Sequence, residues 1–333
     1  MFGYLTLLLV LQAPPNPAET CSGVSPAQFR TWFDAARDGK LEIPAKVSRT
    51  ARRYRYVFVS GFHNEQMPGY FAQNAKELRA KSVPKRSVHF ISPSSHKTVA
   101  GNAKAVRSEF LEIARQGPEK LVVIAHSRGA CDSLAFALQN PEFVADHIQA
   151  LFLVQGPFGG TGVADYVVGE GPALDREMPW RHRLIAYSLG RLEAYQLNRG
   201  KHGGLPSLTR QASKEFWERA LEEHEAAIPV VAPRTFYVTT KTKPSRLRLF
   251  LQATASYLGT YFGPNDGIVA LEDQALPELG TVLAVLDAGH MDLTHRSASS
   301  RPKRRLQTAL IDAIIMTVGE SESGRLAHEH GHR

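Results

Sequence analysis

Ser127 has the sequence surroundings of a nucleophile. It is the third residue of AHSRG (125–129), which follows an apolar run at 121–125 and precedes a helical pattern at 130–138. Small residues two positions before and two positions after a serine let a strand and a helix pack closely around a sharp turn that exposes the hydroxyl. The short pattern occurs often by chance, so the strand and the helix beside it carry the prediction that Ser127 attacks a carbonyl carbon.

A serine hydroxyl becomes a good nucleophile only with a base beside it and an acid that orients the base. For a serine on a strand–turn–helix, the expected chain order is serine, acid, histidine. Asp266 lies in GPNDGIV (263–269), and His290 lies in DAGHMD directly after an apolar run at 281–286. Both residues follow predicted strands, so we expect both side chains at the edge of the sheet where Ser127 lies.

Each of these residues also has a simpler explanation. Asp266 followed by glycine is typical of an ordinary turn, and His290 could be a hydrogen-bonded loop residue. Asp287 competes with Asp266 as the acid, although its side chain is expected to belong to the end of a strand. His126 is a poor base, because the turn points the neighbours of the serine away from it. The order and context of the three residues together favour the catalytic interpretation.

Two backbone N–H groups are expected to stabilise the negative charge that develops on the substrate oxygen. One is the N–H of Arg128, the residue after the nucleophile. The other is the N–H of Phe62, in the loop after an apolar run at 56–60, where Gly61 lets the backbone approach the substrate. These two groups form the predicted oxyanion hole.

A sheet is needed to position these groups, and the sequence predicts one. Six runs of strand length are apolar or β-branched, at 56–60, 87–91, 121–125, 150–154, 235–240 and 281–286. Runs that are apolar on both faces and separated by helical segments are typical of a parallel sheet covered on both sides. Helices are expected at 100–114, at 130–138 and after the capping pair Ser25-Pro26. The predicted fold class is α/β, with a doubly wound, mostly parallel sheet.

The segment 169–233 interrupts the alternation of strands and helices. It contains no convincing strand, but 184–197 and 213–227 have helical patterns. An insertion after a parallel strand lies over the carboxyl ends of the strands, where open α/β folds bind ligands. We therefore predict a helical cap or lid, with peripheral decoration as the alternative. The expected core comprises 21–168 and 234–318.

The two ends of the chain are expected to lie outside the core. Residues 4–13 form an apolar stretch of signal-peptide length, although the usual basic residues before it are missing. We expect 1–20 to be a signal peptide and the protein to be periplasmic or secreted. A packed N-terminal element and a cytoplasmic location are the alternatives. The segment 319–333 contains His328, His330 and His332 and is expected to be a disordered tail rather than a metal site.

Composition limits the function classes. Hydrophobic residues make up 43% and charged residues 22% of the 333 positions, as in folded globular proteins. Cys21 and Cys131 are the only cysteines, which excludes a disulfide scaffold. No apolar run approaches the ~20 residues that cross a bilayer. The net charge of +8 favours an anionic partner. Zinc-finger spacing and RNP-like strings are absent from the sequence, so nucleic acid is not expected.

With these residues in place, the chain resembles the α/β-hydrolases over roughly 54–294 and is most similar to bacterial triacylglycerol lipases. AHSRG is similar to the A-H-S-x-G turn of small Bacillus-type lipases. QGPFGGTGVAD (155–165) resembles their G-x-P-x-x-G-S-x-x-A-D, NDGIV resembles N-D-G-L-V, and HMD resembles H-L-D. The resemblance implies Ser127 as the nucleophile, Asp266 as the orienting acid and His290 as the base.

The chain departs from that family in three respects. Ser60 occupies the position of the usual histidine before the oxyanion loop. Many relatives bind a structural calcium through an aspartate before the triad acid and through the H-L-D aspartate. Asp292 matches the second, but 241–263 contains no aspartate. We therefore expect no calcium site, no other metal and no cofactor. The cap has no clear match.

The sequence thus predicts a serine hydrolase that cleaves lipid or acyl esters through an acyl-enzyme. An acyltransferase, a thioesterase or an amidase would use the same triad, and a hydrolase-fold binding protein is the non-enzymatic alternative. Basic loops beside an apolar cap suit an anionic lipid interface, whereas the sequence does not indicate an oligomeric state. An acyl pocket or interfacial face, or else ordinary packing of the cap, is expected from Leu184, Ile185, Tyr187, Leu189 and Phe216.

Overall fold

The structure is a computed structural model that describes residues 23–174, 179–295 and 301–330. The expected signal peptide at 1–20 lies outside the described residues. No helix among the described residues is both long and apolar enough to cross a membrane.

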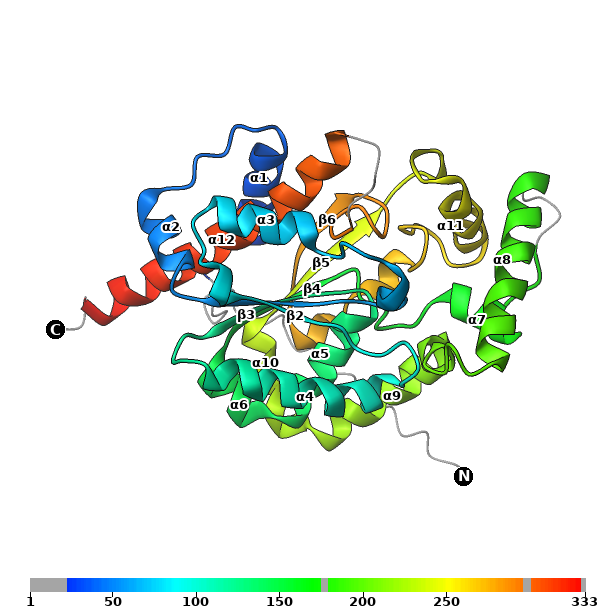
Figure 1. Ribbon diagram of the computed structural model, residues 1–333, viewed down its shortest axis with the longest axis horizontal. Coiled ribbons are helices and arrows are strands. Elements are labelled where there is room, and N and C mark those ends of the chain that lie inside the picture. The colour runs from blue at the N-terminus through cyan, green and yellow to red at the C-terminus, as the bar shows by residue number, and fades with distance from the viewer. Residues whose placement is uncertain (1–22, 175–178, 296–300, 331–333) are drawn as a thin grey trace, which may run out of the picture.

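The core of the molecule is a six-stranded parallel sheet with the strand order β2-β1-β3-β4-β5-β6. The sequence analysis located all six strands and their parallel arrangement. The structure therefore confirms the α/β fold class (Figure 1). The strand bounds are β1 Arg55–Val59, β2 Val88–Ile91, β3 Leu121–His126, β4 Ile148–Val154, β5 Thr235–Lys241 and β6 Thr281–Asp287.

Helices cover both faces of the sheet (Figure 1). One face is covered by α1 (Pro26–Arg37), α2 (Ala45–Ala51), α3 (Ala72–Ala80) and α12 (Arg301–His330). The other is covered by α4 (Val99–Arg115), α5 (Arg128–Gln139), α6 (Pro141–His147), α9 (Arg210–Glu223) and α10 (Ile228–Val231).

Strand β1 shows why its sequence is apolar at consecutive positions. Tyr56 and Phe58 point into the core under α1, α3 and α12, whereas Val57 and Val59 point into the core under α4 and α5. Successive side chains of a strand alternate between the two faces of its sheet. Because both faces are buried here, every position of β1 has to be apolar or satisfied internally.

Local signals set the ends of the predicted helices. Ser25 caps α1 with a capping box, in which its hydroxyl accepts from the N–H of Gln28 and the Gln28 side chain accepts from the Ser25 N–H. The Thr98 hydroxyl caps α4 by accepting from the N–H of Gly101. Both helices lie close to their expected positions.

The C-terminal helix α12 differs from the sequence-based expectation. Its residues 309–318 are buried at every position, so the helix is covered on all sides by α1, α2, α3 and the sheet. The segment 319–333 was expected to be a disordered tail, but α12 continues to His330. No proline interrupts the backbone hydrogen bonds after Gly319. Residues 331–333 lie outside the described part.

The helices of the range 169–233 fall into two groups. Helix α8 (Trp180–Asn198) packs against α7 (Gly162–Val168) and α11 (Leu249–Tyr261), beyond the carboxyl ends of the strands (Figure 1). Helices α9 and α10 instead join the layer that covers the sheet, because Trp217, Ala220 and Val231 are buried in its core. Of these three helices, α8 alone lies at the edge of the sheet where Ser127 is found.

Candidate active site

Ser127 lies on a strained turn between β3 and α5. Its φ of 54° and ψ of −134° are rare for a residue with a side chain and cost on the order of 1–3 kcal/mol. Gly129 is required two positions later, because a Cβ there would lie 2.4 Å from the Ser60 carbonyl oxygen. The tight packing of α5 against the end of β1 therefore holds the turn in this conformation.

The structure brings Ser127, His290 and Asp266 together from three separate loops. His290 Nε2 lies 2.9 Å from Ser127 Oγ, and His290 Nδ1 lies 2.8 Å from Asp266 Oδ2. All three residues are buried. The Asp266 carbonyl also accepts from the N–H of His290 at 2.9 Å, which fixes the two loops to each other. The distances are those of hydrogen bonds.

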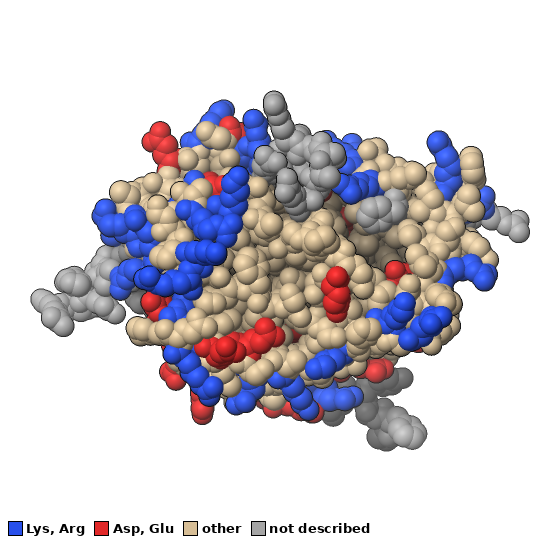
Figure 2. Space-filling view, in the orientation of Figure 1, with Lys and Arg blue, Asp and Glu red and all other residues tan. Residues whose placement is uncertain are grey.

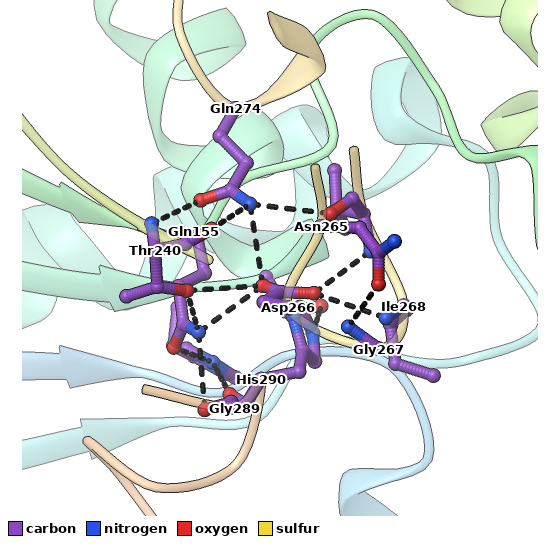
Figure 3. A network of polar contacts seen from close by, with 12 residues as sticks. Gln155, Thr240, Asn265, Asp266, Gly267, Ile268, Gln274, Gly289 and His290 are labelled. Atoms are coloured by element: carbon purple, nitrogen blue, oxygen red, sulfur yellow. Dashed lines mark hydrogen bonds and ion pairs between the residues drawn. The ribbon is translucent and has the colours of Figure 1, made fainter. Parts of the chain in front are cut away.

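Donors surround the Asp266 carboxylate on all sides (Figure 3). Oδ1 accepts from the N–H groups of Ile268 and Val269, at 3.0 and 2.9 Å. In addition to His290, Oδ2 accepts from the side-chain amides of Gln155 and Gln274, at 3.1 and 3.4 Å. These bonds give the buried carboxyl group its hydrogen-bond partners and fix the oxygen that faces the imidazole.

His126 is held away from the nucleophile, as the turn geometry predicted. Its Nε2 lies 2.8 Å from the carbonyl oxygen of His290 and 3.1 Å from Gln155 Oε1. Both partners are acceptors, so Nε2 carries the proton and Nδ1 accepts from the Tyr70 hydroxyl at 2.5 Å. Burial, and then the nearby imidazole of His290, lower the pKa of His126 well below its usual value. The neutral ring serves as a fixed support beneath the loop of His290.

The loop of residues 60–64, called the oxyanion loop below, approaches the nucleophile closely. A Cβ at Gly61 would lie 2.7 Å from Ser127 Cβ and 2.8 Å from the Tyr70 hydroxyl oxygen, so only glycine fits there. Among the described residues, no acceptor binds the N–H of Phe62. Arg128 is the first residue of α5, where an N–H has no acceptor within its helix. Both expected oxyanion donors thus lie in segments that adjoin Ser127.

The side chain of Arg128 is completely buried beneath the oxyanion loop. Its guanidinium donates to the carbonyl oxygens of Ser94 and Lys97 and lies 5.1 Å from the centre of the Phe62 ring. Its Nε lies 3.6 Å from Asp132 Oδ2. The buried cation therefore joins the start of α5 to two loops of the site.

Sequence reasoning missed three residues of this network. Tyr70, Gln155 and Gln274 orient His126 and Asp266, but they come from three segments with no common spacing in the chain. Gln155 has a φ of 53° directly after β4, a signal that only coordinates reveal. The competing acid Asp287 lies at the surface, where it accepts from Thr242 and pairs with Arg246.

An apolar pocket lies next to the loop of Asp266, between α7, α8 and α11. Thr254 in its wall donates to the carbonyl oxygen of Gly267. Among the expected cap residues, Leu189 lines this pocket, Leu184 and Tyr187 are exposed, and Phe216 packs beside Trp217 in the core. The lining residues are Val163, Tyr166, Val167, Ala186, Leu189, Gly190, Glu193, Thr254 and Tyr257.

Known structures share this fold. The structure of a metagenomic carboxyl esterase matches 84% of this chain and 79% of its own, with a TM-score of 0.59 and 19% identity. The match to the mature form of a lipase from Bacillus licheniformis covers 71% of this chain and 84% of the lipase chain, with a TM-score of 0.51 and 19% identity. No protein-family model and no curated protein matches the sequence. The chain has the α/β-hydrolase fold and resembles lipases and esterases in structure, as the sequence analysis predicted.

Proposed function

We propose that this protein is a serine hydrolase that cleaves carboxylic esters of lipids or other acyl compounds. The observation that carries the proposal is the hydrogen-bonded series Ser127–His290–Asp266, with distances of 2.9 and 2.8 Å. It lies at the carboxyl edge of the sheet, where open α/β folds bind ligands. The α/β-hydrolase fold agrees with this activity but does not by itself define it.

The proton positions follow from the partners of His290. Asp266 only accepts, so Nδ1 of the neutral imidazole carries the proton and Nε2 accepts from the Ser127 hydroxyl. Ser127 Oγ then attacks the ester carbonyl carbon while its proton moves to Nε2. The N–H groups of Phe62 and Arg128 stabilise the oxyanion of the tetrahedral intermediate.

Collapse of this intermediate completes the first half of the reaction. The bond to the alcohol oxygen breaks, and the alcohol leaves with the proton from His290 Nε2. Water then loses a proton to Nε2 as its oxygen attacks the acyl-enzyme, and the acid leaves as Ser127 recovers its proton. Asp266 stays ionised throughout and stabilises the imidazolium that forms in each half.

We assign the acyl chain to the apolar pocket between α7, α8 and α11, which has a volume of only about 40 Å³ in this structure and would have to widen by a movement of α8 to admit a chain. Its lining is almost entirely aliphatic and aromatic, and it adjoins the loop that carries Asp266. Helix α8 forms one wall, so the position of α8 would determine how long an acyl chain can enter. This helix is the part of the predicted cap that would set substrate preference.

A fluorophosphonate probe and a graded series of p-nitrophenyl esters test the proposal. The wild-type protein should be labelled and should hydrolyse the esters, whereas Ser127→Ala should lose labelling and at least about 10⁴-fold in kcat. Ser108→Ala, an exposed serine of α4, is the matched control and should behave as wild type. Emulsified triglyceride, assayed in parallel, separates a lipase from an esterase.

Two results would overturn the proposal. Absence of labelling in the wild type, or equal labelling of Ser127→Ala, would favour a hydrolase-fold binding protein. Labelling of Ser127 without ester hydrolysis would instead favour acyl transfer, thioester cleavage or amide cleavage, which share the acyl-enzyme.

Helix α8 also has the features of a lipid-binding surface. Five large apolar side chains on its outer side are each at least half exposed: Trp180, Leu184, Tyr187, Leu192 and Tyr195. The opposite side of the helix packs on α7 and α11 through Ala186 and Gly190. Figure 2 shows basic side chains around this end of the molecule. An exposed apolar face bordered by arginines fits the surface of an anionic membrane.

Vesicle flotation tests this surface. The wild-type protein should float with vesicles that contain phosphatidylserine. The double variant Leu184→Ser/Leu192→Ser should float at least about 10-fold less, because it lacks two apolar side chains that the membrane would bury. Val285→Ser removes an exposed apolar side chain of β6 and serves as the matched control. Equal flotation of the double variant and the control would contradict a role for α8.

A further inference from the structure

Two imidazoles and a carboxylate meet where the oxyanion loop contacts α8. His63 Nε2 lies 3.5 Å and His202 Nδ1 lies 2.9 Å from Glu193 Oε2. One ligand atom from each residue lies within 4.8 Å of the other two, and the described residues contain no second group of three such side chains. A tetrahedrally coordinated ion with metal–ligand distances of about 2.1 Å holds its ligand atoms about 3.4 Å from one another. The three side chains are therefore close to a metal-binding arrangement.

The loops that carry the two histidines are already fixed to each other. Ser95 joins them, because its hydroxyl accepts from the N–H of His63 at 2.9 Å and its carbonyl accepts from the N–H of Gly204 at 3.1 Å. His63 has a φ of 61°, a conformation that costs energy in a residue with a side chain. The body of the protein thus positions both imidazoles, and α8 supplies the carboxylate.

A neighbouring side chain favours the tautomer of His63 that can bind metal. Gln66 Oε1 lies 3.3 Å from His63 Nδ1 and can accept a hydrogen bond from a protonated Nδ1, which leaves Nε2 unprotonated toward Glu193.

An ion could reach this cluster from solvent. The side chains of His63 and Glu193 are 32% and 27% exposed, whereas His202 is buried behind them. Two imidazoles with one carboxylate form a ligand set that suits Zn²⁺ and similar first-row ions, and water can occupy the fourth position. A calcium ion would prefer a set made only of oxygen.

We propose that His63, Glu193 and His202 form a binding site for a divalent transition-metal ion of the zinc type, which fastens α8 to the oxyanion loop. The ion would tie the residue after Phe62 to the outermost helix of the molecule. The sequence analysis expected no metal and did not identify this cluster: Glu193 and His202 are nine positions apart, but His63 lies in a distant loop of the sequence. This proposal does not depend on the ester hydrolase activity.

Zinc titration of the full-length protein tests the site. The background carries His328→Ala, His330→Ala and His332→Ala, so that the histidines near the C-terminus cannot bind the metal. After dialysis against chelator, calorimetry should show one Zn²⁺ per chain, and Zn²⁺ should raise Tm by a few degrees. Glu193→Gln and His202→Ala should each weaken binding by more than about 100-fold, because each removes a direct ligand.

Two comparisons keep the test decisive. His182→Ala removes a histidine of α8 that contacts Ser256 rather than the cluster, and it should bind Zn²⁺ as the background does. Glu193→Gln keeps the shape of a half-buried side chain, so its Tm without zinc should match the background. Absence of saturable binding, or equal affinity in Glu193→Gln and the background, would show that the three side chains form a hydrogen-bonded cluster only.

Discussion

Replacing Asp266 with asparagine should lower kcat/KM for a p-nitrophenyl ester by about 10⁴-fold while the protein remains folded. Oδ1 of the new side chain would keep the N–H groups of Ile268 and Val269 as its donors. The amide nitrogen would then face His290, where it can only donate. The imidazole would have to accept at Nδ1, its proton would move to Nε2, and Nε2 could no longer take the proton of Ser127.

Asp287→Asn is the matched control for this experiment. Asp287 is the competing acid in the same sequence region, but it pairs with Arg246 at the surface. Its replacement should change kcat/KM by less than about 3-fold, the range of a solvent-exposed ion pair. Retention of a tenth or more of the activity in Asp266→Asn, together with a large loss in Asp287→Asn, would move the acid role to Asp287.

A combined variant tests whether the residues act as a unit. Ser127→Ala/Asp266→Asn should be no less active than Ser127→Ala alone, within about 3-fold, because residues of one catalytic unit are strongly non-additive. A further large loss in the double variant would mean that Asp266 acts without the serine.

The parts of the fold that could be predicted are those that local chemistry determines. Strand β1 is apolar at consecutive positions because both of its faces are buried, and that pattern is visible in the sequence. The capping box of Ser25 and Gln28 also marks the start of α1 in the sequence. The middle of α12 is buried on all sides and mostly apolar, so it has no clear amphipathic period, and the sequence analysis did not identify it.

In the candidate site, too, some residues could be predicted from local sequence, whereas others depend on tertiary contacts. Ser127 and His290 come shortly after β3 and β6, so strand prediction was enough to expect them at one edge of the sheet. Asp266 is separated from β5 by α11, and the turn sequence and the chain order of the three residues supplied its prediction. The groups that hold them depend on tertiary contacts. Tyr70 reaches His126 and Gln155 reaches Asp266 only in the folded chain. Arg128 was predicted for its backbone N–H, and nothing in the sequence showed that its side chain would be buried.

That burial leads to the largest expected effect on stability. Arg128→Met should lower the free energy of unfolding by about 3–5 kcal/mol, because methionine fills the space but leaves the Asp132 carboxyl group buried without its cation. The carbonyl oxygens of Ser94 and Lys97 also lose their donor. Urea denaturation of the variant and the wild type measures the difference.

A second substitution should recover part of this loss. In Arg128→Met/Asp132→Asn the buried side chain is neutral, and its amide oxygen can still accept from Asn102, which donates to Asp132 at 3.0 Å. The double variant should be more stable than Arg128→Met by about 1–3 kcal/mol, the usual coupling between contacting residues. If Asp132→Asn destabilised both backgrounds equally, the two side chains would not interact.

The pH dependence of stability distinguishes a charge effect from a packing effect. Burial raises the pKa of Asp132 from 3.8 to about 7, although Arg128 and Asn102 oppose the rise. The folded state therefore holds this proton more tightly than the unfolded state, and the group's contribution to stability falls as pH rises from about 4 to about 7 and is level above that range. Without Arg128 the pKa rises further, so the fall continues to higher pH at up to about 1.4 kcal/mol per pH unit. Arg128→Met should consequently lose more stability relative to wild type at pH 8 than at pH 5, and Asp132→Asn should remove this difference. An equal loss at both pH values would mean that Arg128 stabilises the site by packing alone.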